Sequence, residues 1–248
     1  MRLILLLAFA WMVAWPASAQ EENTGPNANV VREWAGTLRM QAISDKRYRG
    51  VEEWRIFVHP DGSRTMMLSK DFVAFNALQI MTKRVAADFR PIDVYAAYWV
   101  RDGYRGSIRV ALDGDQLRAV SEGPGEPRAE THTVPREIAV ITHGESMNGW
   151  YLWQGEPRSG EPQDLYEFNL SPAAPDGQNV RGILRTGSFQ YLGDDTVTVP
   201  AGTFEAERYK IMNIEMWITG EDRILVKQVI ADEDKEYVLT KLEAVTPD

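Results

Sequence analysis

The residues whose types and spacing best suit chemistry gather in one short segment, residues 142–149. It carries an imidazole, a carboxylate and a hydroxyl within four residues, as His143, Glu145 and Ser146. The segment does not match the nucleophile turn of serine hydrolases, because that turn needs a glycine two residues after the serine and Asn148 stands there. His143 and Glu145 remain candidate acid–base residues if the segment faces a pocket, and the alternative is a solvated polar loop.

The histidines do not suggest a metal site. The chain has three of them, His59, His132 and His143, and their separations in sequence do not fit the local spacing of zinc ligands. His59 belongs to a His-Pro-Asp-Gly turn, and His132 to a predicted exposed strand. The sequence therefore predicts no bound metal.

Acidic residues occur in short runs, at positions 194–195, 221–222 and 232–234. Carboxylates act as general acid and base when burial separates their pKa values, and these runs lie in turn-like polar surroundings. We therefore expect them to be solvated. The sequence has neither a phosphate-binding loop nor a dinucleotide glycine pattern, so no cofactor is expected.

Aromatic side chains are the other feature that could form a site. Large rings can wall a pocket for an apolar ligand, or they can fill the core of a β-rich protein. The candidate ligand-binding residues are Phe72, Phe75, Tyr95, Tyr98, Trp99, Trp150, Trp153 and Trp217. Their partner would be a hydrophobic small molecule or a lipid.

Alternation of apolar and polar residues predicts that β-strands position these side chains. Residues 107–121 have the pattern of a hairpin that turns at Asp113-Gly114. The C-terminal third has the pattern of a three-strand meander, in residues 212–218, 224–231 and 237–242, and its first strand places Met212 and Met216 on one face. Residues 69–86 fit either a helix or strands, because their apolar residues are spaced by three or four.

The first residues resemble a secretory signal. Arg2 precedes an apolar run over residues 3–13, and Ala17-Ser18-Ala19 suits signal peptidase, so we expect cleavage after residue 19. A polar leader over residues 20–33 would follow, and it argues against an uncleaved membrane anchor. The chain contains no cysteine, which excludes a lipid-modified cysteine and disulfides. We expect a periplasmic protein that is not a lipoprotein and has no membrane span after cleavage.

The charge of the chain argues against nucleic acid as a partner. The formal net charge is −9 at pH 7, and no basic stripe interrupts it. Attraction to phosphate supplies most nonspecific affinity for nucleic acid, and this chain lacks it. The charge keeps the protein soluble.

The C-terminal third resembles a known group of exported proteins. A Pro-Ala-Gly-Thr-Phe turn at residues 200–204 precedes a strand, then Trp217 and two closing strands, as in domain of unknown function 3108. Residues 143–153 are similar to a histidine-to-tryptophan segment of related proteins, with Asn148 where aspartate is usual. The resemblance implies a fold like that of the LolA-like lipoprotein carriers, in which a curved, incompletely closed sheet wraps an apolar groove. It implies no catalytic residue.

We therefore expect one β-rich domain over residues 34–248. Its fold would be a curved antiparallel sheet that forms a half-barrel, with or without a helix against the concave face, because a sheet with one apolar face must cover it. The function favoured is a periplasmic binding or carrier protein for a lipid or other hydrophobic ligand. The alternatives are an enzyme acting on an apolar substrate in the same groove, and a scaffold for envelope assembly.

Overall fold

The computed structural model describes residues 29–100, 103–171 and 179–245, which fold into one curved, unclosed sheet. Within these residues the sheet has 15 strands, and all neighbours are antiparallel except β9 and β10. The strands are β1 (Arg32–Ala42), β2 (Tyr48–Val58), β3 (Arg64–Phe72), β4 (Ala77–Val85), β5 (Pro91–Val100), β6 (Gly103–Asp113), β7 (Gln116–Glu122), β8 (Arg128–Thr133), β9 (Ile138–Ile141), β10 (Gln163–Ser171), β11 (Arg181–Val199), β12 (Gly202–Ile211), β13 (Ile214–Thr219), β14 (Ile224–Ile230) and β15 (Lys235–Val245). The predicted signal peptide lies outside the described residues, and β1 begins within two residues of the predicted domain start at residue 34.

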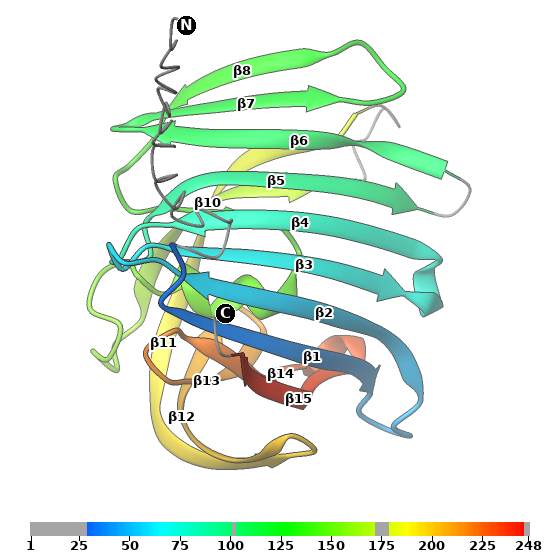
Figure 1. The fold of residues 1–248 in the computed structure, drawn as a ribbon, viewed down its shortest axis with the longest axis vertical. Helices are drawn as coiled ribbons and strands as arrows, with labels where there is room; N and C mark the ends of the chain where they lie inside the picture. The colour runs from blue at the N-terminus through cyan, green and yellow to red at the C-terminus, as the bar shows by residue number, and fades with distance from the viewer. Residues whose placement is uncertain (1–28, 101–102, 172–178, 246–248) are drawn as a thin grey trace, which may run out of the picture.

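The chain starts in the middle of the sheet and visits both edges. It runs from β1 to the edge strand β8, crosses to the opposite edge strand β9, and returns strand by strand until β15 pairs with β1. Figure 1 shows β1–β8 as one layer, with β10–β12 running behind it and across it. The predicted half-barrel is confirmed.

Only residues 134–137 separate the two edge strands, so the edges approach each other without pairing. The side chain of Asn179 bridges this seam, because it accepts a hydrogen bond from the Gly125 backbone N–H (2.9 Å) and donates one to the Glu126 carbonyl (2.8 Å). The rings of His132 and Phe168 also meet across it, with centroids 5.5 Å apart. Side-chain contacts thus connect the two edges at the seam, where neighbouring strands elsewhere are connected by backbone hydrogen bonds.

The period of two in the strands determines which side chains enter the core. In β2, β3 and β4 alternate residues are buried, as the pleat of a sheet requires. Residues 69–86 therefore form strands, interrupted by the short 3-10 helix η1 (Val73–Phe75), and not a helix. The local spacing of three or four was outweighed by pairing with β2 and β5.

Other elements follow the sequence pattern closely. Strands β6 and β7 confirm the hairpin, and β13, β14 and β15 confirm the meander. The prediction that Met212 shares a strand face with Met216 is wrong, because Met212 precedes β13 in a turn with a left-handed backbone (φ 51°) and is exposed. His59 lies in the expected turn, and His132 in β8.

The concave side is covered by the 3-10 helix η2 (Glu145–Tyr151), which contacts β2, β9 and β14. A second short 3-10 helix, η3 (Ala231–Glu233), joins β14 to β15. We call strands β1–β8 and β9–β15 the two arms of the sheet. Gly149 lets η2 lie close to the second arm, since an added Cβ would lie 2.3 Å from the Arg223 carbonyl oxygen. Helix η2 therefore ties together two arms that are distant in sequence.

One buried acid cross-links the fold at the turn between β13 and β14. Asp222 accepts hydrogen bonds from Arg32 (2.8 and 2.9 Å), Trp34 (2.9 Å) and Arg64 (2.8 Å), and these four residues are the Asp222 cluster. The expectation of a solvated acid is wrong here, because the Asp222 side chain is 2 % exposed. Burial alone would raise the pKa of Asp222, but the hydrogen bonds from the two arginines and Trp34 outweigh it and lower the pKa.

Candidate functional site

The segment that carries His143 and Glu145 is held against the sheet by a buried ion network. Glu52 and Lys70 face each other on β2 and β3, both 1 % exposed, with Lys70 Nζ 3.0 Å from Glu52 Oε1. Lys70 also donates to the His143 carbonyl and to the Glu145 carboxylate, each at 2.7 Å. The network fixes both candidate residues in place.

Glu52 further fixes the start of η2. Its two carboxylate oxygens accept hydrogen bonds from the backbone N–H groups of Glu145 (2.8 Å) and Ser146 (2.9 Å), which have no partner inside the helix. The hydroxyl of Ser146 donates to the same carboxylate at 2.7 Å. Ser146 is thus a structural residue, in agreement with the absence of a nucleophile turn.

The edge strand β9 is anchored in a similar way. β9 pairs with β10 alone among the described strands, and buried backbone groups on its open side need other partners. Lys83 donates to the Val140 carbonyl (3.2 Å), and the Tyr98 hydroxyl donates to the Thr142 carbonyl (3.0 Å). Lys83, Tyr98 and Lys70, from three adjacent strands, therefore hold the carbonyls of residues 140, 142 and 143.

Lys83 is a buried lysine without an ionic partner in the part of the chain that the structure describes. Its ammonium lies 4.2 Å from the centroid of the Tyr151 ring and donates only to the Val140 carbonyl. Burial lowers its pKa to about 7, because the charged form loses its hydration. Lys83 is fully buried and donates to a backbone carbonyl of β9, so we assign it to the support of β9.

Beyond η2 lies a cavity of about 270 Å³, which we call the inner pocket. One wall is apolar and comes mostly from strands β10 to β14. Polar side chains come from His143, which follows β9, and from η2, β10, β11, β14, η3 and β15. The lining residues are Ile141, His143, Glu145, Asn148, Tyr151, Leu165, Glu167, Asn169, Arg185, Ile211, Met212, Ile214, Met216, Gln228, Ile230, Glu233 and Lys235.

His143 begins a hydrogen-bonded chain along this pocket. Its Nε2 lies 3.2 Å from Asn169 Oδ1, and Asn169 Nδ2 lies 3.4 Å from Glu167 Oε2. His143 is exposed at the pocket, and the neighbouring side chains remove enough hydration from its ring to lower the pKa of His143, so the ring is neutral at pH 7. Burial raises the pKa of Glu167, with partial opposition from Asn169 and Arg185.

Glu145 differs from Glu167 in the direction in which its pKa is shifted. Burial would raise the pKa of Glu145, but the Lys70 ammonium and the hydrogen bonds from Lys70 and Tyr237 outweigh it and lower the pKa. The carboxylate is therefore ionised and already paired. His143 and Glu145 share one pocket, as acid–base catalysis requires, but Trp150 and Trp153 do not line it, and the enzyme hypothesis expects them there.

Asn148 and Gln228 form a buried amide pair in the same pocket. Asn148 Nδ2 donates to Gln228 Oε1 at 2.6 Å, and the two residues are 6 % and 0 % exposed. Gln228 Nε2 is buried and has no hydrogen-bond partner, and Asn148 Oδ1 has none among the described residues. A buried amide donor without a partner destabilises a fold by about 1–3 kcal/mol, so it needs an explanation.

The aromatic residues singled out by the sequence do not converge on this pocket. Trp150 and Tyr98 are core residues that hydrogen-bond to the Asp222 and Thr142 carbonyls (2.9 and 3.0 Å). Trp217 donates to Asp195 (2.9 Å), Trp153 packs against the core, and Trp99 lies against Tyr104. The remaining three are Tyr95, exposed on β5; Phe72, at the end of β3 beside Lys70; and Phe75, of which the structure describes only the backbone, in η1.

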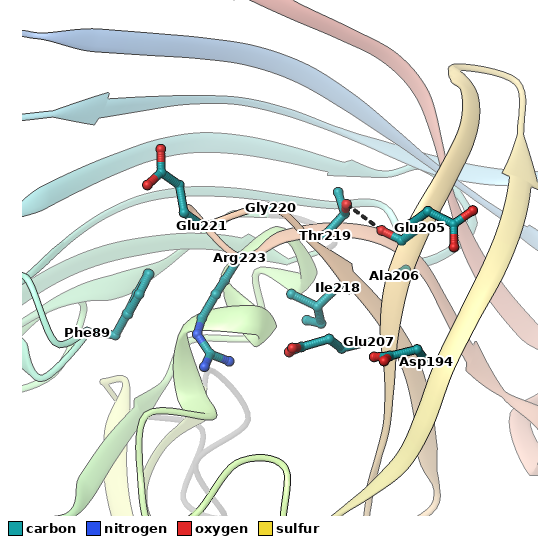
Figure 2. A pocket seen from close by; sticks show the side chains of 10 residues that line it. All are labelled: Phe89, Asp194, Glu205, Ala206, Glu207, Ile218, Thr219, Gly220, Glu221 and Arg223. Carbon is teal, nitrogen blue, oxygen red and sulfur yellow. Dashed lines mark hydrogen bonds between the residues drawn. The ribbon is translucent and has the colours of Figure 1, made fainter.

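A second pocket, the outer acidic pocket, lies beside the β13–β14 turn and has a volume of about 560 Å³ (Figure 2). It is lined by four carboxylates, together with Arg223, which lies between Phe89 and Glu207 in this view. Arg158 pairs with Glu207 and Asp194 at 2.6 and 2.7 Å, and the other two acids contact Thr196 and Arg32. Arg223 Nη1 has no hydrogen-bond partner in the described part of the chain, but the residue is partly exposed. The inner pocket is therefore the stronger candidate.

Among the residues that the structure describes, no group of three or more histidine or acidic side chains is arranged to hold a metal ion. No helix in the described ranges has the length and hydropathy to cross a membrane.

Comparison with known proteins shows the fold. No family model matches the chain, and no curated protein matches it. A beta-barrel-like protein of domain of unknown function DUF1849 from Brucella abortus has a TM-score of 0.53 at 11 % identity, over 88 % of this chain and 99 % of that one. A DUF1089 family protein from Pseudomonas aeruginosa has a TM-score of 0.43 at 10 % identity, over 71 % and 87 %. The expected relation to domain of unknown function 3108 stays a prediction, and the chain has a β-barrel-like fold.

Proposed function

We propose that the chain is a binding protein for a small molecule with one polar and one apolar end, which it holds in the inner pocket. The observation that carries the proposal is the meeting of unpartnered polar atoms with an apolar wall in one partly enclosed cavity. Ligand sites combine these features, since apolar walls supply affinity and a few polar groups fix orientation. Met216 and Met212 add adaptable thioether surface to the wall.

The size of the cavity narrows the expected ligand. Sites for drug-sized ligands have volumes of about 300–1,000 Å³, and the inner pocket has about 270 Å³. Buried side chains from both arms of the sheet fill much of the rest of the concave side. A small amphipathic molecule therefore suits the site better than a lipid with two long acyl chains.

The exported location expected from residues 1–19 belongs to the same proposal, and cell fractionation tests it. A scaffold role has less support from the geometry. A scaffold would need a free sheet edge that can pair with another chain. The edge strand β8 carries Arg128 and Glu130, and charges on an edge strand discourage such pairing.

Recovery of the ligand tests the proposal. The chain is purified without denaturation, extracted with organic solvent and analysed by mass spectrometry, together with two variants. Met212→Trp should block the pocket, whereas Met67→Trp, at an exposed position on β3 outside the pocket, is the matched control. We expect one small molecule from the wild type and from the control, and little from Met212→Trp. No molecule from the wild type, or equal amounts from all three, would contradict the proposal.

A further inference from the structure

The amide pair at the floor of the inner pocket offers one free donor and one free acceptor. The donor is Gln228 Nε2 and the acceptor Asn148 Oδ1, and the two are joined by the 2.6 Å hydrogen bond of the pair. Exchanging oxygen and nitrogen in both side chains changes which residue donates, but it still leaves one donor and one acceptor. A ligand that satisfies both must itself present an acceptor and a donor close together.

The charges around the pocket favour a neutral ligand. An anion would meet the ionised Glu145, and Glu233 at the rim. A cation would meet Arg185 and Lys235, and Lys70 behind Glu145. Because charges of both signs surround the cavity, neither kind of ion gains a clear advantage from entering it.

The apolar wall receives the remainder of the molecule. Leu165, Met216 and Ile211 are 0 %, 0 % and 5 % exposed and line the same cavity. Their side chains are apolar and suit an aliphatic part of the ligand, although Glu167 follows Leu165 on the same face of β10 and Gln228 is the cross-strand partner of Met216.

Resting on the proposed function, we propose that the inner pocket selects a neutral molecule whose polar end is a carboxamide. The carbonyl oxygen accepts from the free amide N–H of the pair, and the amide N–H donates to the free amide oxygen. The aliphatic part lies against Leu165 and Met216.

Calorimetric titration with three probes of equal size tests the inference. Hexanamide has an acceptor and a donor, 2-heptanone has an acceptor only, and hexanoate is an anionic acceptor. We expect hexanamide to bind at least about tenfold more tightly than either, because the other two leave a buried polar atom unpaired. Equal binding of hexanamide and 2-heptanone would overturn the carboxamide inference and leave the proposed function standing. Binding of none of them would contradict both, and tightest binding of hexanoate would replace the carboxamide by an anion.

A double variant shows whether the preference comes from the amide pair. Asn148→Leu combined with Gln228→Met removes both partners and so avoids a single orphaned group. We expect the preference for hexanamide over 2-heptanone to disappear. The matched control is Asn213→Leu with Gln116→Met, which replaces two exposed amides outside the pocket and should keep the preference. A preference that survives in the first double variant would overturn the assignment.

Discussion

The Asp222 cluster and the inner pocket are both buried and polar, but they differ in how completely their groups are paired. Asp222 accepts four hydrogen bonds from Arg32, Trp34 and Arg64. In the inner pocket, Gln228 Nε2 has no hydrogen-bond partner among the residues that the structure describes. A fully paired buried group stabilises the fold by itself, whereas a buried unpaired group needs an explanation, and in the inner pocket the explanation we propose is a ligand. The comparison separates residues that maintain the fold from residues that meet a ligand.

The largest effect is expected at Asp222. Asp222→Ala leaves the guanidinium groups of Arg64 and Arg32 without their buried acceptor, and loss of one partner from a buried charge cluster costs about 3–5 kcal/mol. Urea unfolding measures the change. The neighbouring Glu221→Ala is the control, because that side chain is 71 % exposed and its pair with Arg32 should contribute about 1 kcal/mol or less. Equal losses in the two variants would contradict the account.

Lys70→Met should lower the free energy of unfolding by about 3 kcal/mol at pH 7, because Glu52 and Glu145 stay buried without their cation. The effect depends on pH. Since Lys70 lowers the pKa of Glu145 in the folded state, its contribution is present above the unfolded pKa and is lost as the pH falls through the folded pKa. The difference between wild type and variant should therefore shrink as the pH falls below about 4.5, the ordinary pKa of a glutamate, and a difference that stays constant down to about pH 3 would contradict this.

Lys83→Met should raise the free energy of unfolding at pH 7 by about 1–2 kcal/mol. Removing a desolvated amine stabilises the fold, and this gain exceeds the cost of leaving the Val140 carbonyl unpaired. The folded-state pKa of Lys83 is about 7 and its ordinary value is 10.5, so the unfolded chain binds more protons between these pH values. Wild-type stability should then rise with pH across this window, and the variant should lose this part of the rise. Lys241→Met, at an exposed lysine, is the control and should change neither quantity.

The smallest effect on stability is expected from Asn148→Leu combined with Gln228→Met, a change of about 1 kcal/mol or less in either direction. Replacing both members of a hydrogen-bonded pair by apolar groups of similar shape is nearly neutral. Thermal unfolding measures it beside the calorimetric loss of hexanamide binding. A loss comparable to that of Asp222→Ala would show that the amide pair maintains the fold.

The sequence predicts the architecture better than the site. Regular alternation indicated the β6–β7 hairpin and the C-terminal meander, because register in a half-buried sheet is set by which face is apolar. Residues 69–86 stayed ambiguous, since pairing with distant strands decides between helix and strand there. The aromatic residues were candidates because they cluster in sequence, and three of the eight, Tyr98, Trp150 and Trp217, are core residues.

His143 and Glu145 were identified as candidates from residue type alone, but the residues beside them were missed. Glu167, Asn169 and Gln228 lie on strands β10 and β14, far from residue 143 in sequence. One signal could have indicated them: polar side chains at buried positions of otherwise apolar strands, as in Ile224–Ile230. The sequence could not show which of these side chains share a pocket, because that depends on how the two arms curve toward each other.

The most direct test of the central claim follows the methionines of the inner pocket. The chain is labelled with ¹³C at the methionine methyl groups and titrated with hexanamide. The account predicts that the resonances of Met216 and Met212 shift together and saturate, whereas that of Met67, outside the pocket, stays fixed. If the Met216 resonance does not move, or if the Met67 resonance moves with it, the inner pocket is not the binding site.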